Sequence, residues 1–177
     1  MILFIDMSTQ NKITETESFH RRLRIGDWHF DDRKDAISSV IGLGSCIALA
    51  LYDPVRHYGI LSHLMLPKRL DEFISDSLDL RYIEDAVPFL VEMMRINGSK
   101  KIVAKAVGGA TLFKELISPK KITIGQRNTA SLIKALEKEH IPIVASDFDK
   151  EHGRTITFYH HDGILLVKSY KLGSMEI

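Results

Sequence analysis

The chain lacks the features that define several large protein classes. Its 177 residues include a single cysteine, so no disulfide can form within the chain, and a reducing cytoplasm is the expected compartment. No apolar run approaches the roughly 20 residues that span a bilayer. The N-terminal segment also lacks the basic region and long apolar region of a secretory signal. We therefore expect no membrane insertion and a cytoplasmic protein.

An excess of charge of either sign is also missing. Twenty-four basic and 23 acidic residues leave a net charge of +1, which argues against nucleic acid or an anionic membrane as the main partner. The composition, 45% hydrophobic and 27% charged, is ordinary for a globular protein. Without an internal repeat or linker, we expect one domain over residues 21–171. Residues 1–20 would be an N-terminal extension that could be flexible, and residues 172–177 a short C-terminal tail.

Short apolar strands alternate with two clear helical patterns. The segment "RYIEDAVPFLVEMMRINGS" has apolar residues at helical spacing, and Pro88 within it predicts a kink or the true first turn. In "NTASLIKALEKEH" the second helix is predicted to begin after an N-cap at Asn128. The pair Asp162-Gly163 is typical of a hairpin turn. Together these patterns predict an α/β or α+β domain with a mixed sheet.

Two kinds of ligand site are disfavoured by the motifs. In "GLGSCI" the third glycine of a dinucleotide fingerprint is replaced by Ile47, and no Walker lysine follows. The eight histidines are scattered, and the adjacent His160 and His161 are predicted to be solvated hairpin residues. We therefore expect no nucleotide, metal or other cofactor.

Cys46 is the residue whose interpretation is open. A lone cysteine is most often a small buried apolar residue, and a lone histidine on a strand is most often structural. Gly42 and Gly44, however, bring main-chain N–H groups close to the thiol, where they could receive an oxyanion. His63 lies on a neighbouring predicted strand, and an imidazole within hydrogen-bond reach would lower the thiol pKa. These two residues alone leave the structural and the nucleophilic interpretation both open.

The order of the remaining motifs favours the nucleophile. Between about Arg24 and Lys168 the chain resembles the chemoreceptor glutamine deamidases of bacterial chemotaxis, the CheD family. The segments that carry this resemblance are, in order, "GLGSC", "LYDP", "SHLMLP", "RYIEDAVPFLVEMM", "AKAVGGATLF", "IGQRN", "IPIVASD", "GRTITF" and "DGILLVK".

The resemblance implies both a fold and a chemistry. The fold would be a single-domain three-layer α/β sandwich with a mixed sheet. Cys46 would attack the side-chain amide of glutamines on chemoreceptor cytoplasmic domains, and His63 would assist. Activity on receptor glutamate methyl esters, a chemotaxis phosphatase as partner and the absence of a cofactor are implied as well.

One position departs from the family pattern. The family usually has a threonine six residues before the cysteine, whose hydroxyl helps to hold the histidine, and this chain has Val40 there. Ser39 is adjacent but should face the other side of a regular strand, unless a bulge re-aims it. Ser38 has the right parity but is displaced by two residues. Ser39 is therefore the candidate third residue, with a main-chain carbonyl as the alternative.

Several further interpretations stay open. Weakened catalysis would favour a weakly active or inactive binding module for a chemotaxis phosphatase. A third interpretation is a cysteine hydrolase that acts on small amides or peptides. Gly108-Gly109 is predicted to be a tight turn where the backbone comes close to another segment. Arg127 and Asn128 could line the cleft.

Overall fold

The strands form two sheets. The structure is a computed structural model that describes residues 19–69, 78–112, 115, 118 and 121–177. Each sheet has five strands, and each mixes parallel and antiparallel pairs, so the α/β class is confirmed and the single expected sheet is corrected to two. Nearly all of the extension expected at residues 1–20 lies outside the described residues.

The first sheet has the strand order β1-β3-β8-β9-β10. Its strands are β1 (His20–Arg22), β3 (Ile37–Leu43), β8 (Arg154–Tyr159), β9 (Ile164–Ser169) and β10 (Gly173–Glu176). The hairpin predicted at Asp162-Gly163 is confirmed, because β8 and β9 pair antiparallel and Gly163 has a φ of +68° at the turn. The tail expected at 172–177 is mostly β10, which pairs antiparallel with β9 at the edge of the sheet.

The second sheet carries the most buried strands. Its order is β2-β5-β4-β6-β7, with bounds β2 (Trp28–Asp31), β5 (Tyr58–Leu64), β4 (Ile47–Asp53), β6 (Val103–Gly108) and β7 (Ile143–Phe148). All residues of β4 and β5 are buried, because one face meets the helices and the other meets the first sheet. This two-sided burial explains why "IALALY" shows no alternation of polar and apolar residues.

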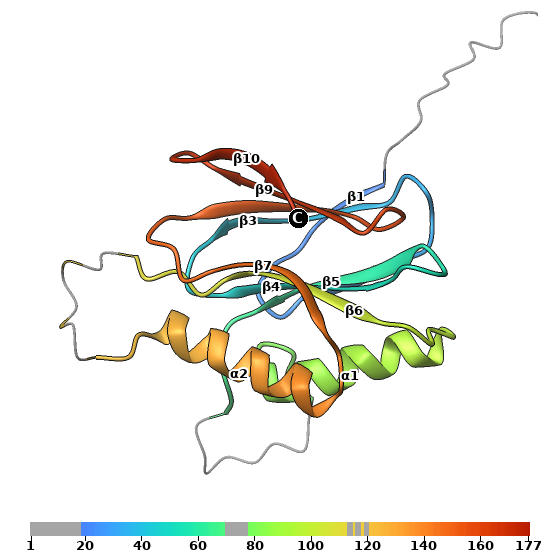
Figure 1. Cartoon of the computed structure of the whole chain (residues 1–177), viewed down its shortest axis with the longest axis horizontal. Helices are drawn as coiled ribbons and strands as arrows, with labels where there is room; N and C mark the ends of the chain where they lie inside the picture. Colours follow the sequence, from blue (N-terminus) through green and yellow to red (C-terminus); the bar gives the residue numbers. More distant parts are fainter. Residues whose placement is uncertain (1–18, 70–77, 113–114, 116–117, 119–120) are drawn as a thin grey trace, which may run out of the picture.

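Both helices cover one face of the second sheet, and the first sheet lies against its other face (Figure 1). Helix α1 (Ile83–Ile96) buries an apolar stripe, and Pro88 lies inside it rather than in its first turn. Helix α2 (Ile124–Lys138) begins earlier than predicted, since Thr123 is its N-cap and forms a capping box with Gln126. No helix in the described part of the chain is long and apolar enough to cross a membrane.

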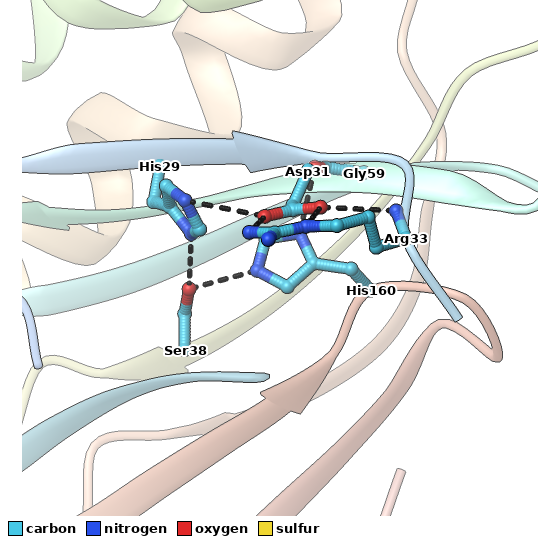
Figure 2. A network of polar contacts seen from close by, with 6 residues as sticks. All are labelled: His29, Asp31, Arg33, Ser38, Gly59 and His160. Carbon is cyan, nitrogen blue, oxygen red and sulfur yellow. Dashed lines mark hydrogen bonds and ion pairs between the residues drawn. The ribbon is translucent and has the colours of Figure 1, made fainter. Parts of the chain in front are cut away.

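A buried polar network joins the two sheets (Figure 2). His160, predicted to be solvated, is fully buried directly after β8, so that prediction is wrong. Its Nε2 lies 2.7 Å from Ser38 Oγ on β3, and Ser38 Oγ lies 2.9 Å from His29 Nδ1 on β2. The second ring nitrogen of His160, Nδ1, lies 2.9 Å from the Gly59 carbonyl oxygen on β5.

The partners fix the direction of each hydrogen bond in this network. A carbonyl only accepts, so His160 Nδ1–H donates to Gly59 and the neutral ring accepts from Ser38 O–H at Nε2. Ser38 then accepts from His29 Nδ1–H. The order Asp31, His29, Ser38 looks like a hydrolase triad, but Ser38 is fully buried and its hydroxyl cannot reach a substrate. We therefore assign the network a structural role.

The network predicts a loss of stability in acid. Burial lowers the pKa of His160 from 6.5 to about 4. Between these values the unfolded chain takes up a proton at this imidazole and the folded chain does not. The free energy of unfolding therefore falls as the pH drops through this window, by up to about 3 kcal/mol from this group. Urea denaturation of wild type and His160→Gln at pH 7 and pH 4 measures this contribution. We expect the difference in the free energy of unfolding between the two proteins to be smaller at pH 4 than at pH 7.

A neighbouring histidine provides the control. His161 is half-buried and follows His160 directly. We expect the free energy of unfolding of His161→Gln to depend on pH as that of the wild type does, because this variant keeps His160. If His160→Gln also kept that dependence, the pKa of His160 would not be depressed in the folded protein.

Candidate functional site

Cys46 and His63 come from neighbouring strands. Cys46 directly precedes β4, and His63 lies on β5 opposite Ala48. Because side chains alternate along a strand, Cys46 and His63 are diagonal neighbours on the same face of the sheet. That face meets the first sheet, and Cys46 packs against the apolar cluster between the sheets. The described residues include no hydrogen bond between the two side chains.

The segment before β4, residues 44–46, is here called the cysteine loop, and its three carbonyl groups are all held. Ala110 N–H donates to Gly44 O at 3.0 Å, and Gly109 N–H donates to Cys46 O at 3.1 Å. Asn128 Nδ2 donates to Ser45 O at 2.8 Å. Within the described part of the chain, no main-chain hydrogen bond is donated by the N–H of Ser45 or Cys46. These two N–H groups therefore have no main-chain acceptor among the described residues.

Gly108 and Gly109 permit this close contact, as the sequence predicted, but Gly108 is the last residue of β6 and not part of the tight turn that was expected. Gly108 has a φ of +139°, and a Cβ there would overlap the Cys46 carbonyl oxygen. Gly109 has a φ of +66°, and a Cβ there would overlap Thr129 Oγ1. Both the conformation and the space exclude larger residues.

His63 is buried and held mainly through the main chain. Its side chain and main chain together are 8% exposed, and its N–H donates to Asp27 O at 3.0 Å. Burial lowers the pKa of the imidazole, while a hydrogen bond with the main chain of Leu23 and the charge of Asp27 raise it. A hydrogen bond that raises an imidazole pKa is donated by the ring N–H, so the partner on Leu23 is the carbonyl oxygen. Nδ1 is buried and has no partner among the described residues.

The candidate third residue lies elsewhere. Ser39 Oγ is 2.9 Å from His20 Nε2 on β1, and Val40 is fully buried in the cluster between the sheets. Strand β3 does contain an irregularity, but it lies between Val40 and Leu43, after Ser39. The structure therefore brings Cys46 and His63 together on one face and does not bring Ser39 to them.

Burial keeps the two central groups neutral. It raises the pKa of the Cys46 thiol, partly offset by the residue's own main-chain N–H. The lowering expected from a neighbouring imidazole is thus not what this arrangement gives. With a raised thiol pKa and a lowered imidazole pKa, the pair is a thiol and a neutral imidazole at pH 7.

A cavity of about 280 Å³ opens beside the cysteine loop. Arg127 lines this cavity, whereas Asn128 is fully buried behind it. The lining residues are Ser45, Ala110, Thr111, Leu112, Lys121, Ile122, Thr123, Ile124 and Arg127. Arg127 also lines a second cavity of about 430 Å³ that continues along α2. The described residues contain no group of three side chains suited to hold a metal ion.

Sequence reasoning missed the role of Asn128 in this arrangement. The sequence predicts a helix cap at Asn128, but the residue lies inside α2 and its amide donates to two other segments. The capping box at Thr123 and Gln126 was the signal that could have placed it inside the helix.

Comparisons with known proteins agree on one family. The family profile described as "CheD chemotactic sensory transduction" matches residues 65–169. That span begins just after His63. A solved structure, that of the Bacillus licheniformis hypothetical protein YfiH, aligns with a TM-score of 0.41 at 13% identity over 74% of this chain and 60% of that chain. A likeness this weak carries no argument.

Three relatives carry the name "Probable chemoreceptor glutamine deamidase CheD". The protein from Caldanaerobacter subterraneus subsp. tengcongensis is 38% identical over 139 residues, which is 77% of this chain and 85% of that protein. The protein from Archaeoglobus fulgidus is 37% identical over 155 residues, 86% of this chain and 96% of that protein. The protein from Clostridium novyi is 36% identical over 139 residues, 77% of this chain and 85% of that protein. An alignment over 86% of the chain spans Cys46 and His63 wherever it begins. Since the profile matches more than half of the chain and the relatives align over most of their own length, the chain belongs to the CheD family.

Proposed function

We propose that this chain is a cysteine-dependent protein-glutamine deamidase that acts on chemoreceptor cytoplasmic domains. The observation that carries the proposal is the shared face of Cys46 and His63, next to free N–H groups and an open cavity. The names of the relatives support the reaction and the substrate class. The proposed residues are Cys46 as nucleophile and His63 as general base and acid.

The reaction starts from the neutral pair. Sγ of Cys46 attacks the glutamine Cδ while His63 takes the thiol proton, and the oxygen that becomes negative is received by the N–H groups of Ser45 and Cys46. The C–N bond then breaks, and the proton on His63 leaves with ammonia. In the second half His63 takes a proton from water as it attacks the thioester. That proton returns to Cys46, and the substrate is left with a glutamate.

Ring orientation in this scheme comes from the main chain. The Leu23 carbonyl accepts from one imidazole N–H, and Nδ1, which is buried and has no partner among the described residues, is in this proposal the nitrogen that exchanges the proton with the Cys46 thiol. The hydroxyl that the family usually supplies is then replaced by a carbonyl. Ser39 acts in this proposal only through its own carbonyl, which accepts from Leu23 N–H at 2.8 Å.

A regulatory binding role is the second candidate function, and Val40 is the observation that favours it. Val40 is fully buried and offers no hydroxyl, and Ser39 Oγ is engaged by His20. A protein with slow chemistry could still bind a chemotaxis phosphatase. Binding to such a phosphatase without any turnover of receptor glutamine would establish this role in place of the first.

The first test removes each proposed catalytic group. Cys46→Ala should abolish deamidation of a receptor signalling fragment and change the free energy of unfolding little, because Cys46 is only half-buried and the hydrogen bonds of the cysteine loop are made by its main-chain atoms. His63→Gln should lower kcat by about 10²- to 10⁴-fold. Mass spectrometry of the fragment measures the conversion of glutamine to glutamate.

A surface variant is the control for this test. His152→Gln changes a half-buried histidine that lies outside β4, β5 and the cysteine loop and should keep wild-type turnover. Undiminished conversion by Cys46→Ala would contradict the nucleophile assignment.

The second test concerns pH. The pKa of the thiol is raised above 9.0 and that of His63 is lowered below 6.5. Deamidation should therefore be flat around neutral pH and fall in acid only below 6.5, as His63 becomes protonated. Alkylation of Cys46 by iodoacetamide should be slow at pH 7 and rise with a midpoint above 9.0, because the thiolate is the reactive form.

The two readouts separate the neutral pair from a preformed ion pair. His63→Gln should lose turnover but keep the alkylation rate measured above pH 9.0. Fast alkylation of the wild type at pH 7 would mean that the thiolate already exists in the free protein and would rule out the neutral starting state.

A further inference from the structure

Asn128 joins the two segments that carry the proposed catalytic residues. It lies on α2, is fully buried, and uses both amide hydrogens: Nδ2 donates to Ser45 O at 2.8 Å and to Met65 O at 2.9 Å. Ser45 directly precedes Cys46, and Met65 follows the strand of His63 by one residue. Both partners are carbonyl oxygens, so the orientation of the amide is dictated by the structure.

The bond to Ser45 acts on the peptide group that carries the Cys46 N–H. A peptide unit is planar, so holding its carbonyl oxygen also fixes the direction of its N–H on the other side. A hydrogen bond accepted by the carbonyl further polarises the unit and strengthens its N–H as a donor. That N–H lies close enough to the Cys46 sulfur to lower the thiol pKa.

The bond to Met65 sets the spacing of the two strand ends. The last ladder pair joins Ile47 to Leu64, and the next position on each strand is Cys46 and Met65. One amide held between the two segments therefore fixes their separation where the regular pairing ends.

The remaining atom of the side chain indicates that stability is not the reason for this residue. Asn128 Oδ1 is buried and has no partner among the described residues. An unsatisfied buried acceptor costs free energy. Only a neutral side chain with two donors and this length serves both carbonyls, since aspartate has no donor and glutamine is longer by a methylene.

We propose that Asn128 is a positioning residue of the deamidase site, which aims the Cys46 N–H at the oxyanion and holds the ends of β4 and β5 together. This inference rests on the proposed function. Asn128 touches no substrate atom, and its effect passes through the peptide between Ser45 and Cys46.

Asn128→Ala is the test variant, and Ser131→Ala is its matched control. Ser131 lies on the same helix and donates to Pro67 O at 3.3 Å, but it does not touch the cysteine loop. We expect Asn128→Ala to lower kcat by about 10²-fold, as for the loss of an oriented oxyanion donor, with KM nearly unchanged. Ser131→Ala should keep both constants.

A second readout does not depend on deamidation. Loss of the fixed Cys46 N–H should move the midpoint of Cys46 alkylation by iodoacetamide to higher pH in Asn128→Ala and leave it unmoved in Ser131→Ala. If the wild type has no deamidase activity, the proposed function fails, while the alkylation midpoint still decides whether Asn128 positions Cys46.

Two outcomes overturn the inference. One is an Asn128→Ala protein with wild-type kcat and alkylation midpoint, and the other is an equal change in both variants, which would mean a general structural effect. If Asn128→Ala loses its cooperative unfolding transition, kcat and KM of Asn128→Gln are measured instead, because this variant keeps both amide donors. A wild-type kcat in Asn128→Gln, with its donors displaced by a methylene, would then overturn the positioning role, and a reduced kcat at unchanged KM would support it.

Discussion

The candidate site depends on a direct main-chain contact between the end of β6 and the cysteine loop. The end of β6 lies directly on the cysteine loop, with Gly108 against the carbonyl of Cys46 and Gly109 N–H bonded to it. Arg154, whose side chain is fully buried, donates to Gly108 O at 2.9 Å and forms an ion pair with Asp147 at 2.7 Å. A charged side chain from the first sheet thereby fixes the strand end of the second sheet that supports Cys46. The segment after β6 holds the carbonyls of Gly44 and Cys46, and Asn128 on α2 holds that of Ser45, so all three carbonyls of the cysteine loop are engaged.

Two different kinds of contact hold the sheets together, and this determines the electrostatics of the site. At one end His160, Ser38 and His29 form a hydrogen-bonded polar bridge. Around Cys46 the side-chain contacts include the apolar cluster between the sheets, and His63 is buried on the same face. The same desolvation that makes this cluster favourable keeps thiol and imidazole uncharged. In the proposed mechanism, Cys46 would therefore be activated during the attack and not before it.

The sequence predicted those parts of the fold that depend on local chemistry. The hairpin at Asp162-Gly163 follows from one turn, and α1 follows from one apolar stripe. The prediction that α2 begins after Asn128 is wrong. Asparagine is a residue type that is common at N-caps, but here Thr123 is the N-cap, and it forms the reciprocal hydrogen bonds of a capping box with Gln126. The division into two sheets could not be read from the sequence, since it depends on pairings between distant strands.

In the candidate site, too, the features set by local sequence could be predicted and those set by distant contacts could not. Cys46 and His63 could be paired from the sequence because one turn links their strands, so the register follows from local spacing. His160 was misread for the opposite reason: its burial depends on Ser38 and Gly59, which are far away in the chain. The contribution of Asn128 is also long-range, because its partners Ser45 and Met65 belong to segments that the helix meets only in the folded protein.

In the proposed mechanism, a main-chain carbonyl takes the place of the hydroxyl that Val40 lacks. A hydroxyl that orients an imidazole must come from a particular residue, but a carbonyl is present at every residue and needs only to be held in place. Here Leu23 is held by its N–H bond to Ser39 O, and Ser39 in turn belongs to β3, which is paired on both sides by β1 and β8. In the proposed mechanism, the orientation of His63 would then depend on the pairing of β3 and not on the identity of residue 40. Val40 can fill space in the cluster between the sheets, where a threonine would have to bury a hydroxyl.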